Sequence, residues 1–99
     1  MLKCANASFK AADARLNSVR KQLVRYLDDE QRKALADADG KWVAFREANC
    51  KSQSLLYSGG SLEAVELANC RAGMTEERFK ELDGLHKYLS EILVPRDSR

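Results

Sequence analysis

The 99-residue sequence has little proline, histidine or aromatic content, and it contains no long apolar run. There is one proline, one histidine and one tryptophan, and aromatic residues make up 7% of the chain. With 44% hydrophobic and 32% charged residues, the composition excludes the disordered, collagen-like and membrane-spanning classes. We predict a single globular domain over residues 1–99, with frayed ends at residues 1–6 and 95–99.

The sequence also lacks an excess of one charge. The net charge is +2, too close to neutral for a dedicated nucleic-acid binder, and we predict no nucleic-acid partner. The charges are nevertheless unevenly distributed, since residues 3–25 carry six cations and one anion whereas residues 61–94 carry four cations and seven anions. This asymmetry fits either a solvated basic helix face that partly neutralises the acidic half or a docking surface.

Recognisable catalytic motifs are missing. No G-x-S-x-G, H-E-x-x-H, P-loop or G-x-G-x-x-G pattern occurs, and no two cysteines are spaced C-x-x-C. The lone His86 lies at the edge of a predicted apolar helix face, where a packing role is expected, and nothing in the sequence places it beside a thiol. We therefore predict no catalytic residue, no metal site and no cofactor, and hence a protein that is not an enzyme.

Apolar residues recur at helical spacing through nearly the whole chain, and no alternating strand pattern occurs. The spacing predicts an all-α, compact bundle of about four helices. The first covers about residues 7–27, the second follows a capping box of Asp28 and Gln31, the third covers about residues 61–71, and the last follows Thr75 and ends before Pro95. The predicted inward-facing residues are Phe9, Ala12, Leu16, Val19, Leu23 and Leu27, then Leu35, Ala38, Trp42 and Phe45, then Phe79, Leu82, Leu85, Leu89 and Leu93.

Between Lys51 and Gly60 the helical pattern fades into a predicted surface loop. The loop carries Leu55, Leu56 and Tyr57, which either form an exposed anchor for a partner or fold back over the core.

Two arginines lie on or beside apolar helix faces. Arg78 falls within the apolar arc of the last predicted helix, so its guanidinium needs an acceptor. Arg46 lies near Asp39 at the edge of the Trp42 face. We expect both arginines to hold helix to helix and not to contact a ligand. The candidate acceptors for Arg78 are Asp13, Asp39 and Glu47.

Three cysteines leave one without a partner. Cys50 and Cys70 each lie near the end of a predicted helix, on either side of a Gly-Gly turn, a placement that can bring them together. A bridge would close a loop of about 20 residues and stabilise the fold by about 3 kcal/mol. The thiols are either reduced in a cytosolic protein or bridged in an exported one whose signal is absent from this chain, and we expect the second. Cys4 is then a free thiol, part of an intermolecular bridge, or the partner of a cysteine in a removed upstream segment.

Several motifs occur in a specific order. The pattern W-x-x-F-R-x-x-x-C covers residues 42–50, Gly-Gly-Ser covers residues 59–61, Cys70 follows, and T-x-x-R covers residues 75–78. Upstream are Cys4 and the segment A-D-A-R-L-N at residues 12–17. This series resembles the LprI-type lysozyme-inhibitor-like domain family over roughly residues 4 to 82. The residues that match its structural motif are Asp13, Leu16, Asn17, Trp42, Phe45, Arg46, Gly59, Gly60, Thr75 and Arg78.

The resemblance implies a small exported bacterial domain, periplasmic or secreted, with a disulfide between Cys50 and Cys70. It also implies a non-enzymatic protein that binds a protein partner, namely a lysozyme or another cell-wall hydrolase. The sequence departs from the family pattern at Arg20, where the family usually has tyrosine, and at Asp39, where it usually has glutamine. These two changes introduce a base and an acid that can pair in this fold.

A surface that binds a cationic, peptidoglycan-cleaving enzyme should be acidic or protruding. The candidate partner-binding residues are therefore Leu55, Leu56, Tyr57, Glu63 and Glu66. Two alternatives remain open. One is an immunity-type protein that neutralises a delivered toxin, and the other is an envelope structural or oligomerisation module that associates through residues 55–57 or through Cys4.

Overall fold

The computed structural model describes residues 1–96, and this part of the chain is entirely helical apart from its turns and ends. Helix α1 spans Leu2–Val24, α2 spans Asp29–Ser54, the short 3-10 helix η1 spans Leu55–Tyr57, and α3 spans Ser61–Ile92. The all-α prediction is confirmed. Residues 97–99, at the predicted frayed C-terminus, lie outside the described residues, while the Arg96 backbone N–H donates to the Arg25 carbonyl at 2.7 Å.

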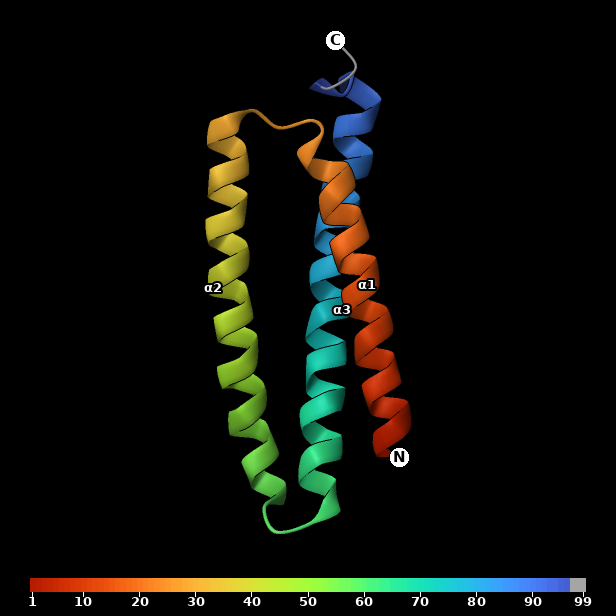
Figure 1. Cartoon of the computed structure of the whole chain (residues 1–99), viewed down its shortest axis with the longest axis vertical. Helices are drawn as coiled ribbons and strands as arrows, with labels where there is room; N and C mark the ends of the chain where they lie inside the picture. Colours follow the sequence, from red (N-terminus) through yellow and green to blue (C-terminus); the bar gives the residue numbers. More distant parts are fainter. Residues whose placement is uncertain (97–99) are drawn as a thin grey trace.

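The three long helices form an elongated molecule of 55 × 23 × 16 Å. In Figure 1, α3 lies between α2 and α1. Helix α1 packs along α3 over a much more extensive contact than α2 does. The main core consists of Leu16, Val19 and Leu23 of α1 against Leu82 of α3, and a smaller cluster joins Ala5 to Val65 and Ala68 near the N-terminus of α1.

The prediction of four helices was wrong, because the expected third and fourth helices are one continuous helix, α3. Thr75, predicted to cap the last helix, lies in the middle of α3 and is fully buried. Its hydroxyl accepts a hydrogen bond from Arg46 Nη1 at 3.3 Å instead of capping a helix N-terminus. Gly73 resembles a helix stop in sequence, but a glycine costs a helix only about 1 kcal/mol. Burial of Ala68, Thr75 and Leu82 on α3 outweighs that cost.

The helix cap predicted from local residues was more accurate than the predicted number of helices. The Asp28 side chain accepts from the Gln31 N–H at 2.8 Å, and the Asp28 N–H donates to the Gln31 side chain at 2.9 Å, which confirms the capping box. The first helix, however, begins at Leu2 and ends at Val24, earlier at both ends than predicted. Helix α2 runs on to Ser54, so the expected loop from Lys51 is largely helical.

Some predicted core residues are on the surface. Phe45 is 60% exposed, and Leu85 and Leu93 are also exposed, so their assignment to the core was wrong. Leu85 and Leu93 line an open hollow with Leu23 of α1 and Leu35 of α2, where the packed helices leave them partly uncovered. His86 packs as expected, with its ring centroid 5.7 Å from that of Tyr26.

Candidate protein-binding site

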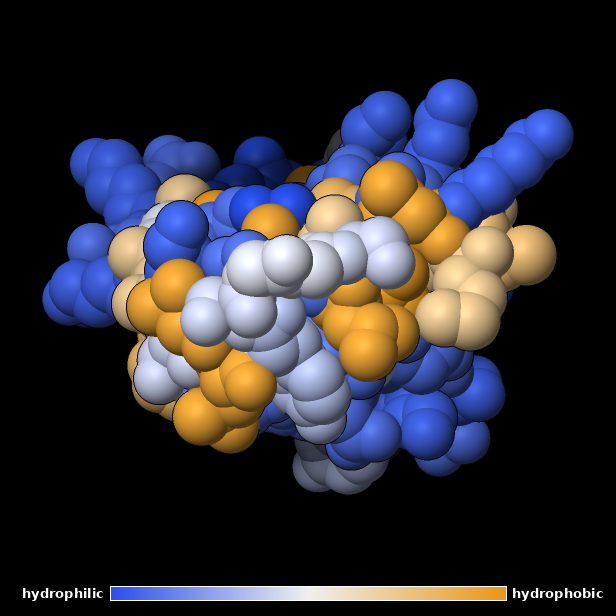
Figure 2. Space-filling model, turned by 90° about the horizontal axis from the view of Figure 1, so that it is seen from below, coloured by the Kyte–Doolittle hydropathy of each residue, from blue (hydrophilic) through white to orange (hydrophobic). Residues whose placement is uncertain are grey.

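The turn between α2 and α3 carries the candidate residues at one end of the molecule. Leu55, Leu56 and Tyr57 form η1, and all three are exposed, with Leu56 exposed by 82%. They therefore do not fold back over the core. Figure 2 looks at this end of the molecule and shows hydrophobic areas among hydrophilic ones. Leu62, at the start of α3, is also exposed here, as are Met1 and Leu2.

The shape of this turn depends on its two glycines. Gly59 has φ +90°, a left-handed conformation that glycine adopts without the steric cost imposed by a Cβ. Gly60 is the N-cap residue of α3. Glu63 and Glu66 follow in the first two turns of α3, so the structure places both at the same end of the molecule as η1. Negative charge is favourable near this helix N-terminus. We call residues Leu55, Leu56, Tyr57, Glu63 and Glu66 the η1 surface.

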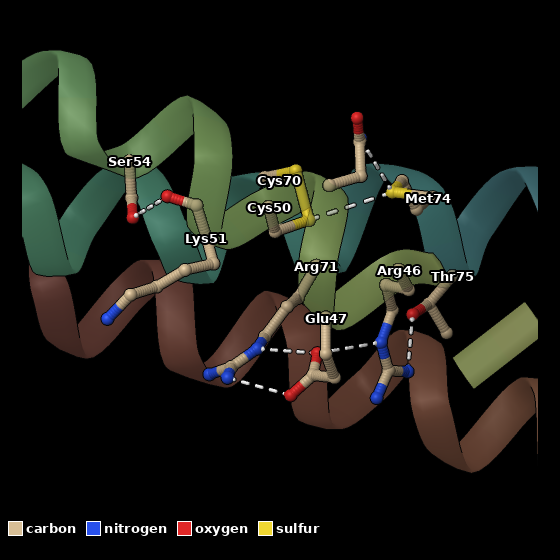
Figure 3. Close-up of a disulfide and its surroundings, with 10 residues drawn as sticks. Arg46, Glu47, Cys50, Lys51, Ser54, Cys70, Arg71, Met74 and Thr75 are labelled. Carbon is tan, nitrogen blue, oxygen red and sulfur yellow. Dashed lines mark hydrogen bonds and ion pairs between the residues drawn. A yellow bond between two sulfur atoms is a disulfide. The ribbon is translucent and has the colours of Figure 1, made fainter. Parts of the chain in front are cut away.

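A disulfide links α2 and α3, the helices on either side of η1. Cys50 of α2 and Cys70 of α3 are bonded, with their Cα atoms 5.5 Å apart, and Cys50 is fully buried. The bridge that the resemblance implied is therefore present in the structure (Figure 3). One turn further along α2, the Ser54 hydroxyl is buried and donates to the Lys51 carbonyl at 2.9 Å. Cys4 is a free, exposed cysteine on α1.

Beside the disulfide lies a network of two arginines and one carboxylate. Arg71 donates to Glu47 through Nε at 3.0 Å and Nη2 at 2.8 Å, and Arg46 Nε donates to the same carboxylate at 3.2 Å (Figure 3). The hydrogen bonds from Arg71 are the largest cause of a lowered Glu47 pKa, and the hydrogen bond from Arg46 lowers this pKa further, against the opposing effect of desolvation. Both guanidinium groups also lie near the Phe9 ring, at 5.0 Å for Arg46 and 6.0 Å for Arg71. This cluster ties all three helices together.

A second charged cluster joins the helices nearer the middle of the molecule. Asp39 of α2 is buried, and it forms ion pairs with Arg20 Nε at 2.7 Å and with Arg78 Nη2 at 3.0 Å. The pairing expected between the two departures from the family pattern, Arg20 and Asp39, is therefore confirmed. Of the three proposed acceptors for Arg78, Asp39 is the one that binds it, whereas the Glu47 carboxylate accepts hydrogen bonds from Arg71 and Arg46.

The remaining motif residues differ in their burial and in their contacts. Arg46 lies over the Trp42 ring at 5.1 Å, as its predicted position implied, but its hydrogen bonds go to Glu47 and Thr75. Leu16 is buried in the core. Asn17 is 3.5 Å from Asp13 and accepts from Arg20 at 2.9 Å on the exposed side of α1. Phe45 is largely exposed.

Sequence reasoning missed the pairing of Glu47 with Arg71. A signal was present, since Glu47 precedes Cys50 by one helical turn and Arg71 directly follows Cys70, so the bridge brings the two charges together. It also missed the ion pair between Arg15 and Glu76, which joins the surfaces of α1 and α3.

The described residues include no group of three or more histidine, cysteine or acidic side chains placed to hold a metal ion. None of the helices in residues 1–96 is long and apolar enough to cross a membrane. The geometry defines a disulfide-bonded, all-α domain whose charged clusters connect its helices.

Comparison with known proteins identifies the family. The model of the family described as Lysozyme inhibitor LprI matches residues 1–82, and the chain therefore belongs to the LprI lysozyme inhibitor family. It is also similar to the uncharacterized protein R02472 of Rhizobium meliloti (strain 1021), with 27% identity over an alignment that covers 83% of this chain and 68% of the relative. No solved structure matches the chain.

Proposed function

We propose that this protein is a non-enzymatic, exported domain that binds and inhibits a lysozyme or a related cell-wall hydrolase through the η1 surface. Membership of the LprI lysozyme inhibitor family supports a role of this kind. The observation that carries the proposal is the exposure of Leu55, Leu56 and Tyr57 on a turn held by the Cys50–Cys70 bridge. Apolar residues on a rigid turn bind a partner at low entropic cost.

The charges of the η1 surface suit a cationic enzyme. Glu63 and Glu66 lie in the first two turns of α3, the helix that directly follows the apolar turn. Acidic side chains around an apolar anchor steer a basic partner and fix its orientation. The disulfide supports an extracytoplasmic location, because structural disulfides persist in oxidising compartments.

The proposal is tested by titrating the oxidised domain against several lysozyme types and recording residual lysis of cell walls. We expect dose-dependent inhibition that is lost after reduction and alkylation. Leu56→Ser removes the most exposed leucine of the turn and should weaken inhibition about tenfold or more, and Glu63→Gln with Glu66→Gln should weaken it and reduce its salt dependence. Ile92→Ser, an exposed apolar residue at the opposite end of α3, is the matched control.

Each outcome bears on the proposal. Equal inhibition by the Leu56→Ser and Ile92→Ser variants would overturn the assignment of the η1 surface. If no lysozyme type is inhibited at high excess, the inhibitor role is rejected. Sedimentation of the same sample then separates the two alternatives, because self-association supports an envelope module and a monomer leaves the immunity-type function.

A further inference from the structure

A groove between α2 and α3 lies apart from the η1 surface. The hollow has a volume of about 490 Å³ and is lined by Trp42 of α2 and by Gly73, Met74, Glu77, Arg78 and Glu81 of α3. No residue of α1 lines it. Its apolar lining comes mainly from the Trp42 and Met74 side chains, both only partly buried. The groove is therefore open to solvent along the two helices that pack less extensively against each other.

Two exposed apolar or aromatic residues, Phe45 and Tyr88, lie at helical spacing from residues that line this groove. On α2, Phe45 follows Trp42 by one turn and is 60% exposed. On α3, Tyr88 follows Glu81 by two helical turns and is exposed. Leu85, between them, lines a separate hollow with Leu23 and Leu35. Exposed apolar residues that form a stripe along a helix mark interaction sites more often than scattered ones do. Two adjacent helices with such stripes present the ridges and grooves into which a further helix packs.

The carboxylates at the rim of the groove favour a basic binding partner. Glu77 and Glu81 are one turn apart, and their side chains are 76% and 66% exposed. Their ion pairs, with Lys80 and Arg78, are both long, at 3.6 Å. The carboxylates therefore keep most of their capacity to accept hydrogen bonds from a guanidinium.

We propose that the α2–α3 groove binds a basic amphipathic helix of a protein partner. The apolar face of that helix packs on Trp42, Met74 and Phe45, and an arginine on its edge binds Glu77 and Glu81. The inference does not depend on lysozyme inhibition, and it uses residues outside the η1 surface.

A second copy of the chain fits the groove less well than a foreign helix. The basic helix available in this protein is α1, but its apolar residues Leu16, Val19 and Leu23 are already buried against α3. A nucleic acid or another polyanion is disfavoured because both rim residues, Glu77 and Glu81, are carboxylates.

Trp42 is the only tryptophan of the chain, so its fluorescence reports directly on the groove. The probe is a designed helical peptide with leucines at helical spacing and arginines beside them. Its counterpart has glutamate in place of each arginine, and neither contains tryptophan or tyrosine. We expect the arginine peptide to produce a saturable change in Trp42 emission at low salt, and the glutamate peptide to produce none.

Variants at exposed positions separate the groove from the rest of the surface. The double change Glu77→Gln and Glu81→Gln should weaken binding of the arginine peptide about fivefold to tenfold, a loss typical of two exposed charge pairs. Phe45→Ala should weaken it through lost apolar contact. Glu63→Gln with Glu66→Gln removes the same charge from the same helix and should leave peptide binding unchanged, although it weakens hydrolase inhibition.

Three results would overturn the proposal. The first is an unchanged Trp42 emission when the arginine peptide is added. The second is equal affinity of the protein for the two peptides. The third is an affinity of the Glu77→Gln, Glu81→Gln variant for the arginine peptide that equals that of the native protein. Circular dichroism of each variant checks that the helices are intact. Failure of these tests leaves lysozyme inhibition through the η1 surface intact, because that activity is measured separately and responds to different variants.

Discussion

Charged side chains between the helices decide how α2 is held in this protein. Asp39 and Glu47 both project from α2, and each is contacted by two arginines. Such pairs contribute to stability only when both partners are present, because removal of one leaves the other charge desolvated and unpaired. The free energy of unfolding should therefore change when one member of such a pair is substituted, and it should depend on pH.

Glu47 is expected to make stability depend on acid. Its pKa is held below the ordinary value of 4.5, mainly by the hydrogen bonds from Arg71. A carboxylate with a lowered pKa in the folded state stabilises the protein above its unfolded pKa and loses that effect as the pH falls through its folded pKa. The free energy of unfolding of Glu47→Gln, measured in urea, should be lower than that of the native protein at pH 7, with the difference shrinking at pH 3. A constant difference would contradict this, and Glu30→Gln, at an exposed position, is the control.

Asp39 is the more deeply buried of the two acids. Asp39→Ala leaves the partly buried Arg20 and Arg78 without this acceptor and should lower the free energy of unfolding by about 2–4 kcal/mol. Asp39→Asn keeps an oxygen that can accept from Arg78 and should cost less. Urea unfolding monitored by circular dichroism measures both. An Asp39→Ala variant as stable as the native protein would show that the cluster adds no stability.

At the scale of elements, the helices tolerate glycines that look like breaks in the sequence. Helix α2 continues through Gly40 and α3 through Gly73 and Gly84. Helix propensity is a weak tendency, and long-range packing overrides it here. The predicted boundary before Thr75 failed for this reason, whereas the boundary at Asp28 was predictable because its capping interactions are local.

Two glycine substitutions should have opposite effects. A Cβ at Gly40 meets no atom within 4 Å, so Gly40→Ala should raise the free energy of unfolding by about 1 kcal/mol through helix propensity. Gly59 has φ +90°, and Gly59→Ala should lower it by about 1 kcal/mol or more although space is available. Thermal unfolding measures both changes. A shift in the same direction for both variants would contradict this account.

At the scale of the whole molecule, the disulfide compensates for an uneven distribution of packing. Helix α1 has the larger contact with α3, and the Cys50–Cys70 bridge ties the less extensively packed α2 to the same helix. The bridge encloses a segment with a sequence separation of 20 residues. It restricts the conformations of the unfolded chain, and in the folded chain it links the helices on either side of η1.

Removal of the bridge should loosen α2 more than α1. Cys50→Ser with Cys70→Ser is expected to lower the free energy of unfolding by about 3 kcal/mol. Amide hydrogen exchange should accelerate more in α2 than in α1. Cys4→Ser should leave both measurements unchanged, since Cys4 is exposed and unbridged within the chain. Equal acceleration in α1 and α2 would contradict the proposed role of the bridge.

Properties that depend on residues close together in the chain could be predicted from the sequence alone. Helical periodicity, the Asp28 cap and the need of Arg78 for an acceptor all follow from spacing within one helix. Other properties depend on which helix faces are covered. The spacing of Phe45 and Leu85 predicts burial, yet both are exposed. Leu85 lines an open hollow with Leu23 of α1 and Leu35 of α2, so the packed helices leave it partly uncovered. The merging of two predicted helices into α3, the pairing of Glu47 with Arg71 and the open α2–α3 groove arise when the packed helices bring together residues that are distant in the chain.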